Sequence, residues 1–297
     1  MYVITGATGN TGKPITLALL AAGKKVRIIT RNAEKAQELA DKGAEVVEGN
    51  WGNAETLTQA LKGATAAYLM IPPDMQAPDF FAHQKNFADA FATAIEASGL
   101  QYAVTLSSVG AHLPQKAGVV QGLQYMESRL NAIEKLNVLH LRASYFMENI
   151  LGQIGLIKFA GVMGSPVKGN LKLGMVATKD IATVAATRLL ALDFSGKSVQ
   201  YILGSRDVTY DEIAAIAAPI TGKENLPYVE MSYADFRNAM LQQWGASESA
   251  ANCMCEFIES LNAGRVMEQA VRNNNSTTPT SIEDFMQTVF AYLYSAG

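Results

Sequence analysis

The sequence predicts an α/β protein with a doubly wound parallel sheet and a smaller, mostly helical C-terminal lobe. Short apolar segments that favour β-structure alternate regularly with helical segments through the first half of the chain. A glycine-rich turn directly follows the first of these strands, and a helix follows the turn. In such sheets ligands bind beyond the carboxyl ends of the strands, near the point where strand order reverses.

The N-terminal half supplies the elements of this sheet. The expected strands are 2–4, 24–30, 44–49, 66–71, 102–107 and 138–142. The expected helices are 13–22, a segment through 37–39, 54–61, 78–98 and 121–136. Gly23 marks the end of the first helix, and Pro72-Pro73 ends the fourth strand.

The C-terminal half has a different pattern and predicts a lobe that folds over the sheet and closes a pocket. We expect helices at 145–159, 178–192 and 285–294, a strand at 199–203, and a helical, loop-rich stretch at 224–275. Capping boxes are expected at 209–212 and 280–283.

The turn after the first strand has the residue types of a phosphate cradle. Gly6, Gly9 and Gly12 recur at a spacing of three, and Pro14 suits the first turn of the following helix. Glycines let the backbone approach a pyrophosphate, and the helix N-terminus offers N–H groups and partial positive charge. The alternative is an ordinary strand-to-helix turn.

Composition excludes several classes of protein. The 297 residues are 49% hydrophobic and 17% charged, with a formal net charge of −3. These values indicate a folded protein without a basic footprint for nucleic acid or anionic membranes. We expect no signal peptide, no membrane span and a cytoplasmic location. Cys253 and Cys255 lie in an apolar helical stretch, and the cysteines and histidines have no metal-site spacing, so no metal is expected.

The glycine turn has the form G-A-T-G-N-T-G, which resembles the extended and atypical short-chain dehydrogenase/reductases, and among them the NmrA-like family. Further similar motifs follow in order along almost the whole chain: 30–32, 49–50, 107–108, 142–149, 179–181 and 209–212. The resemblance implies a Rossmann-like domain with NAD(P) across the top of the sheet. It places residues 1–143, with 173–205, in that domain, and 144–172 and 206–297 in a lobe that binds substrate or effector.

The expected cofactor site extends from the glycine turn to the ends of the later strands. Its residues are Gly6, Thr8, Gly9, Asn10, Thr11, Gly12, Arg31, Asn50, Met70, Ile71, Pro72 and Ser107. Where an acidic residue would bind both ribose hydroxyls of NAD(H), this chain has Arg31, with Lys35 one helical turn later. A guanidinium matches a 2′-phosphate, so NADP(H) is preferred over NAD(H). The alternative is that Arg31 is a solvated residue at a helix start.

A catalytic pair is suggested by the helix after the fifth strand. Related dehydrogenases place a tyrosine and a lysine four residues apart there, and this chain has Tyr125 and Arg129. These are the candidate catalytic residues. Because arginine has a different reach from lysine, the favoured alternative is that Tyr125 packs as an ordinary helical aromatic.

The expected substrate residues are Ser108, Tyr145, Phe146, Met147 and Asn149, although apolar residues of this kind are equally common in protein cores. The resemblance implies a reductase that transfers hydride from NADPH to a small quinone or conjugated carbonyl. The alternatives are a redox-sensing regulator that binds NAD(P) without turnover and, less favoured, a nucleotide-sugar epimerase. The expected partner is a small-molecule substrate or effector, and a homodimer is left open.

Overall fold

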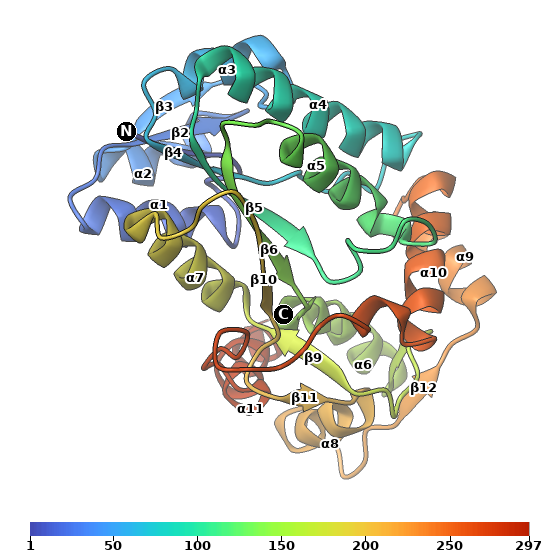
Figure 1. Ribbon diagram of the computed structural model, residues 1–297. Coiled ribbons are helices and arrows are strands. Elements are labelled where there is room, and N and C mark those ends of the chain that lie inside the picture. Colours follow the sequence, from blue (N-terminus) through green and yellow to red (C-terminus); the bar gives the residue numbers. More distant parts are fainter. Residues whose placement is uncertain (297) are drawn as a thin grey trace.

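The computed structural model describes residues 1–296 and contains a seven-stranded sheet with a smaller lobe at one end (Figure 1). The strand order is β10-β6-β5-β4-β1-β2-β3, and all neighbouring strands are parallel. The strands are β1 (Tyr2–Ile4), β2 (Val26–Thr30), β3 (Glu45–Glu48), β4 (Ala66–Leu69), β5 (Tyr102–Ser108), β6 (Asn137–Ala143) and β10 (Lys197–Ile202). The predicted doubly wound fold is therefore confirmed, and strand order reverses between β1 and β4.

Helices cover both faces of the sheet. On one face lie α1 (Gly12–Ala21) and α7 (Thr178–Ala191), and on the other lie α3 (Ala54–Leu61), α4 (Phe80–Ser98) and α5 (Gln121–Asn131). The short α2 (Gln37–Asp41) follows the 3₁₀ turn Glu34–Ala36 beyond β2. Side chains alternate accordingly along β1: Tyr2 and Ile4 join the core below α1 and α7, whereas Val3 joins the core below α3 and α4.

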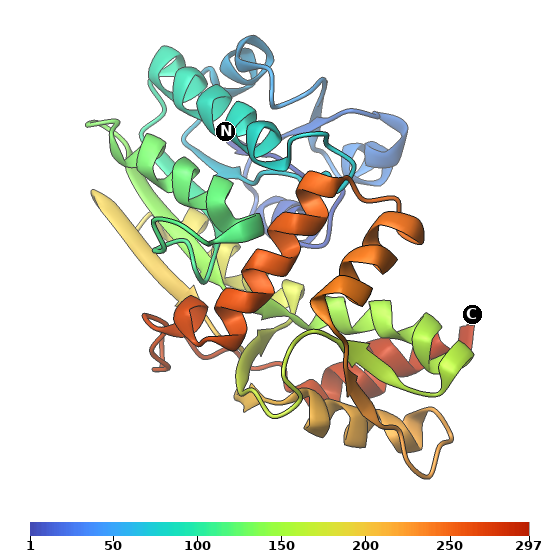
Figure 2. The ribbon, with the colours of Figure 1, turned by 90° about the vertical axis from the view of Figure 1, so that its right-hand side faces the viewer.

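The lobe combines two small sheets with helices. One sheet has the order β11-β9-β7, and the other pairs β12 with β8. Their strands are β7 (Tyr145–Phe146), β8 (Met163–Ser165), β9 (Leu173–Val176), β11 (Asp207–Val208) and β12 (Tyr228–Glu230). The helices are α6 (Ile154–Ala160), α8 (Tyr210–Ile220), α9 (Tyr233–Gln242), α10 (Glu248–Asn262), α11 (Ile282–Phe285) and α12 (Ala291–Ala296), the last two joined by a π-helical segment at Met286–Phe290. Figure 2 shows α9 and α10 side by side between the helices of the large sheet and the lobe.

Two local expectations differ from the structure. The helix expected at 145–159 begins instead with strand β7, because Tyr145 and Phe146 pair with Met175 and Val176 of β9. A 3₁₀ segment at Met147–Gln153 and the short α6 follow.

The second difference concerns the helix caps. The capping box at Thr209 forms as predicted, but the last helical segment is capped by Ser281 rather than Thr280. The backbone N–H and hydroxyl of Thr280 instead donate to the buried Asp180, at 3.0 and 2.8 Å. This contact joins α7 of the large sheet to the C-terminal segment.

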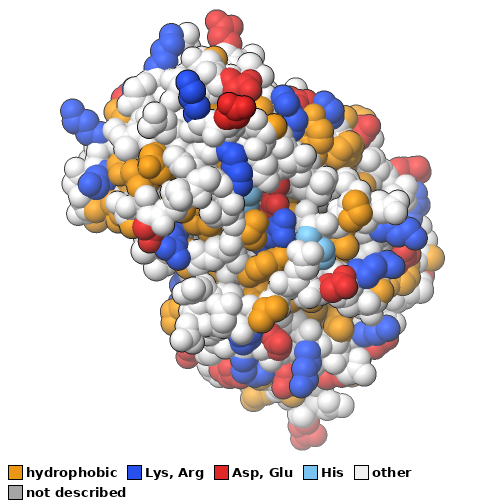
Figure 3. Space-filling view, in the orientation of Figure 1, with side chains coloured by type: hydrophobic (Ala, Val, Ile, Leu, Met, Phe, Trp, Pro, Cys, Tyr) orange, Lys and Arg blue, Asp and Glu red, His pale blue; other side chains and the backbone are white. Residues whose placement is uncertain are grey.

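Helix α7 and strand β10 lie with the large sheet, whereas β9 belongs to a small sheet of the lobe. The division into domains stays a prediction. Figure 3 shows basic and acidic side chains interspersed on the face it presents. Within residues 1–296, no helix has the length and apolar character to cross a membrane.

Candidate functional site

The glycine turn between β1 and α1 requires its glycines at two positions. Gly6 has a φ of +63°, a conformation that residues with a Cβ rarely adopt. A Cβ on Gly12, the first residue of α1, would lie 2.2 Å from the carbonyl oxygen of Gly6. Thr11 precedes the helix and makes no side-chain cap to it, and the first turn contains no acidic residue. The N–H groups of this turn are thus suited to a phosphate.

Thr11 is held from below by the sheet. The Tyr68 hydroxyl donates to Thr11 Oγ1 at 3.0 Å, and burial raises the pKa of Tyr68. On the outer side of the turn, Thr8, Gly9 and Asn10 are exposed. The turn therefore has a fixed inner side and an open outer side.

The edge formed by β2 and β3 brings Arg31 and Trp51 together. Arg31 is exposed directly after β2, and its guanidinium carbon lies 5.9 Å from the centre of the Trp51 ring. Trp51 Nε1 donates to the carbonyl oxygen of Met70 at 3.1 Å, which fixes the ring near the end of β4. Asn50 is exposed beside it, with its side-chain oxygen accepting from the N–H of Gly52. The sequence reasoning missed Trp51, although it directly follows Asn50.

A cavity of about 600 Å³ lies between the carboxyl ends of the strands and the lobe. Seven of the predicted residues line it: Met70, Ile71, Ser107, Ser108, Tyr145, Phe146 and Asn149. Met147 is instead buried in the core of the lobe, and the carbonyl oxygen of Pro72 accepts a hydrogen bond from the His83 ring. Met70 connects the cavity with the glycine turn, because its Sδ lies 2.7 Å from where a Cβ on Gly6 would be.

The outer wall of the cavity comes from a region that sequence reasoning described only as a closing lobe. Its side chains project from α9, α10 and the segments next to them: Phe236, Trp244, Met254, Phe257, Ile258, Leu261 and Met267. Phe236 and Trp244 pack edge to face with their ring centres 5.6 Å apart, and Trp244 is 58% exposed. The cavity thus has an apolar wall with an aromatic pair at its exposed side.

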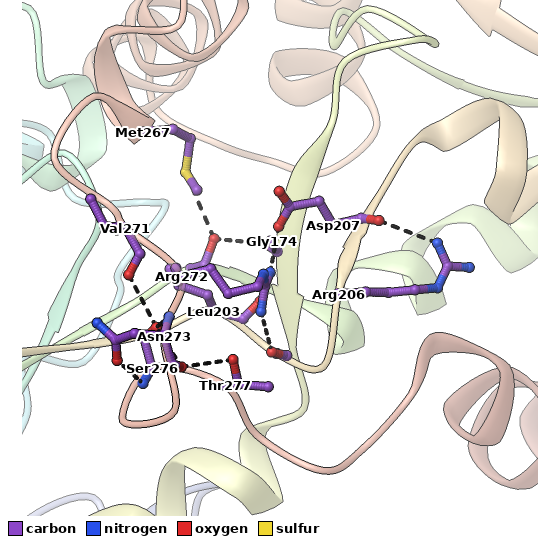
Figure 4. Close-up of polar contacts among 12 residues, drawn as sticks. Gly174, Leu203, Arg206, Asp207, Met267, Val271, Arg272, Asn273, Ser276 and Thr277 are labelled. Carbon is purple, nitrogen blue, oxygen red and sulfur yellow. Dashed lines mark hydrogen bonds and ion pairs between the residues drawn. The ribbon is translucent and has the colours of Figure 1, made fainter.

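The segment after α10 holds Met267 in this wall. The Met267 sulfur lies 3.8 Å from Ser144 Oγ, whose hydroxyl donates to the carbonyl oxygen of Gly174 at 2.6 Å. Arg272 then donates to the carbonyl oxygens of Leu203 and Gly204, at 3.0 and 2.6 Å, and forms an ion pair with Asp207 (Figure 4). The segment is therefore tied to the end of β10.

Tyr125 and Arg129, the candidate catalytic pair, both turn toward α4. The Tyr125 hydroxyl and Arg129 Nε each donate to Asp89 Oδ1 at 2.9 Å, and Lys85 also pairs with this carboxylate. Burial raises the pKa of Asp89, but hydrogen bonds from Lys85, Tyr125 and Arg129 outweigh it and lower that pKa overall. Tyr125 is not among the residues that line the cavity. Its catalytic role stays a prediction, and this geometry favours a structural one.

Ser107 has a buried acidic partner that the sequence reasoning did not identify. Its hydroxyl donates to Glu127 Oε1 at 2.5 Å. Arg142 donates to both oxygens of Glu127, at 3.0 Å to Oε1 and 2.6 Å to Oε2. Burial lowers the pKa of Arg142, but the contacts with Glu127 reverse this effect and raise it above its ordinary value. The signal available in sequence was weak, because Glu127 looks like any polar residue on a helix.

Two tyrosines form a second polar group in the cavity wall. The Tyr210 hydroxyl donates to the Tyr145 hydroxyl at 3.3 Å, and burial raises the pKa of both. Across the rest of residues 1–296, no cluster of three or more His, Cys, Asp or Glu could hold a metal. Cys253 and Cys255 are half-buried thiols on α10, as predicted, and burial raises the pKa of each.

Comparison with known proteins identifies relatives along the whole chain. The model of the NmrA-like family matches residues 2–286. A (4-alkanoyl-5-oxo-2,5-dihydrofuran-3-yl)methyl phosphate reductase of Streptomyces griseus is 27% identical over 244 residues, 82% of each chain. Quinone oxidoreductase 2 of Escherichia coli is 26% identical over 275 residues, 91% of each chain.

The fold is shared with solved structures. A crystal structure of an NADPH-dependent quinone oxidoreductase from Escherichia coli, complexed with NADPH, superposes with a TM-score of 0.81 at 23% identity. The match covers 98% of this chain and 100% of the other.

Proposed function

The chain belongs to the NmrA-like family, and from this premise we propose that it is an NADPH-dependent reductase of quinone-like or conjugated carbonyl compounds. The observation that carries the proposal is the position of the cavity. Met70 lines the cavity at the carboxyl end of β4 and also lies against Gly6 of the glycine turn, and from there the cavity extends beneath the lobe. A dinucleotide held at the turn would thus have its reactive ring at a closed, largely apolar site.

The residues present fit NADP(H). The glycine turn leaves room for a pyrophosphate where any Cβ would clash, and the N-terminus of α1 favours its charge. Arg31 provides a guanidinium for a 2′-phosphate and a planar surface for adenine. Trp51 keeps that guanidinium beside the end of β3, where Asn50 is also exposed. We therefore assign the adenosine end to Arg31, Asn50 and Trp51.

NADPH, when bound, supplies a hydride. The chain contributes position and exclusion of water: Ser107 and Met70 lie at the strand ends, and the apolar wall from α9 and α10 covers the space above them. A quinone accepts hydride readily, and its product oxygens can take protons from water. A catalytic acid is then unnecessary, which agrees with the direction of Tyr125 toward Asp89.

The cavity supports a flat, mostly apolar substrate. Its volume of about 600 Å³ lies within the range of small-molecule sites, roughly 300–1,000 Å³. Phe236 and Trp244 provide aromatic surface on which a planar ring can stack. The names of two relatives support a conjugated carbonyl or quinone substrate, since one is a quinone oxidoreductase and the other a reductase of an (alkanoyl-oxo-dihydrofuranyl)methyl phosphate.

The test is consumption of NADPH, followed by its absorbance, against a panel of simple quinones and enals. We expect turnover well above the uncatalysed rate with at least one class. Trp244→Ala should raise KM for planar quinones, whereas Tyr292→Ala, which removes an aromatic 70% exposed on α12, should leave it unchanged. Absence of turnover, together with different affinities for NADP⁺ and NADPH, would support the redox-sensing regulator instead.

A further inference from the structure

Ser107 is a buried polar side chain of the cavity whose hydroxyl is held by a short hydrogen bond to an acid. It lies on β5, is 2% exposed, and its hydroxyl donates to Glu127 at 2.5 Å. Glu127, on α5, is 5% exposed and lies on the side of Ser107 away from the ligand space, since it does not line the cavity. The function proposed above uses Ser107 but assigns no role to this carboxylate.

The partners of Glu127 fix the direction of the hydrogen bond. An ionised carboxylate only accepts, and an arginine only donates and keeps its charge. Because Arg142 donates to both oxygens of Glu127, both of these oxygens act as acceptors. The single hydroxyl hydrogen of Ser107 must therefore point toward Glu127. What Ser107 presents to the cavity is its oxygen lone pairs.

The arrangement is rigid. Arg142 also donates to the Tyr201 hydroxyl at 2.9 Å, and its guanidinium carbon lies 5.7 Å from the centre of that ring. If Arg142 moved away from Glu127, it would therefore also lose its contact with Tyr201. Rotating the Ser107 hydrogen into the cavity would break a short, charge-assisted hydrogen bond and leave a buried carboxylate oxygen short of a donor.

We propose that Glu127 is a positioning residue that makes Ser107 an obligatory hydrogen-bond acceptor, and that this selects the N–H₂ group of the nicotinamide carboxamide. The inference rests on the proposed binding of NADP(H). Ser107 then contacts the N–H₂ half of the carboxamide and not its carbonyl oxygen. It also means that Ser107 does not donate a proton to a substrate oxygen.

The experiment compares two nucleotides that differ at this group. NADP⁺ carries a carboxamide, whereas its 3-acetylpyridine analogue carries a methyl ketone, which keeps the carbonyl but has no N–H. Calorimetric titration of the purified protein gives the two dissociation constants. For the unmodified chain we expect NADP⁺ to bind about tenfold more tightly, as expected for one hydrogen bond to a polarised acceptor.

Glu127→Gln should abolish this preference. Its amide oxygen, in the place of Oε2, can still accept from Arg142, while its N–H₂, in the place of Oε1, loses the bond from Arg142 Nε, donates to Ser107 and turns the serine hydrogen into the cavity. The ratio of the two dissociation constants should then fall to about one or invert. Glu134→Gln, the same change at an exposed acid just beyond α5, should keep the tenfold preference.

A second pair of variants leaves the buried ion pair intact, so it tests the inference even if Glu127→Gln does not fold. Ser107→Ala should lose the preference, and Ser107→Thr, which keeps a hydroxyl, should retain it. Circular dichroism establishes that each variant is folded. A folded Glu127→Gln protein with the original tenfold ratio, or equal ratios in Ser107→Ala and Ser107→Thr, would overturn the proposal. If the unmodified chain binds neither nucleotide, the proposed function itself fails.

Discussion

Replacing Arg31 tests which dinucleotide the chain binds. Arg31→Gln removes the positive charge but keeps a polar side chain of similar length. The guanidinium is exposed and contacts the Trp51 ring at 5.9 Å, so it is already held at the ligand edge before any phosphate arrives. Losing it should weaken NADPH binding and leave NADH binding nearly unchanged, because NADH has no 2′-phosphate.

The size of this effect follows from the exposure of Arg31. A hydrogen bond to a charged group contributes about 1.5–3 kcal/mol, and solvent screening at an exposed site favours the lower end. A loss of about 1.5 kcal/mol corresponds to roughly a tenfold rise in the NADPH dissociation constant. Arg31→Asp should give a larger loss, since a carboxylate would repel the phosphate.

The assay is titration of each variant with NADPH and with NADH, at low and high salt. Lys25→Gln is the matched control, because Lys25 is an exposed cation at the opposite end of β2. It should leave both dissociation constants unchanged. Equal losses for NADPH and NADH in Arg31→Asp would refute the assignment of Arg31 to a 2′-phosphate.

Three further predictions concern the turn, the pair on α5 and acid stability. Gly12→Ala should abolish NADPH binding, because its Cβ would lie 2.2 Å from the Gly6 oxygen; unchanged affinity in calorimetry would contradict the cradle. Tyr125→Phe should leave kcat unchanged and lower the free energy of unfolding by about 1 kcal/mol, since its hydroxyl binds Asp89; a large fall in kcat would restore it as a catalytic acid. Burial lowers the pKa of His140 from 6.5 to about 4. Because the unfolded chain then binds a proton that the folded chain does not, about 3 kcal/mol of the free energy of unfolding should be present above pH 6.5 and lost as pH falls toward 4. Urea unfolding across this pH range should show a smaller loss of stability for His140→Gln than for the unmodified chain. Equal losses in the two proteins would exclude the histidine as the cause.

Sequence was sufficient for the features that depend on local periodicity or on backbone conformation. Alternating apolar strands and helices predict the parallel sheet, because each pattern is a property of a short segment. The turn from Gly6 to Gly12 is equally local, since its close approach and positive φ require glycine whatever surrounds it. Arg31 could be placed because it directly follows a predicted strand. The confirmed fold and the expected phosphate cradle both came from such patterns.

Tertiary structure decided the features that depend on how separate segments face one another. Tyr125 and Glu127 are two residues apart on α5, yet one contacts Asp89 of α4 and the other lies beneath Ser107. Their spacing places them on different sides of the helix, but only the rotation of the packed helix decides which of the two faces Ser107. Thr280 likewise reads as a cap, but Asp180, 100 residues away, binds it.

The residues that form the outer wall of the cavity could likewise not be identified from the sequence. Trp244 and Met267 come from a stretch whose pattern indicated only helices and loops. Trp244 packs against Phe236 of α9, and the segment that carries Met267 is tied by Arg272 to the end of β10. The sequence alone therefore determined the conformation of the glycine turn and predicted a phosphate site there. Only the packing of the lobe against the strand ends decided what closes the space above it, because those contacts join residues far apart in the chain.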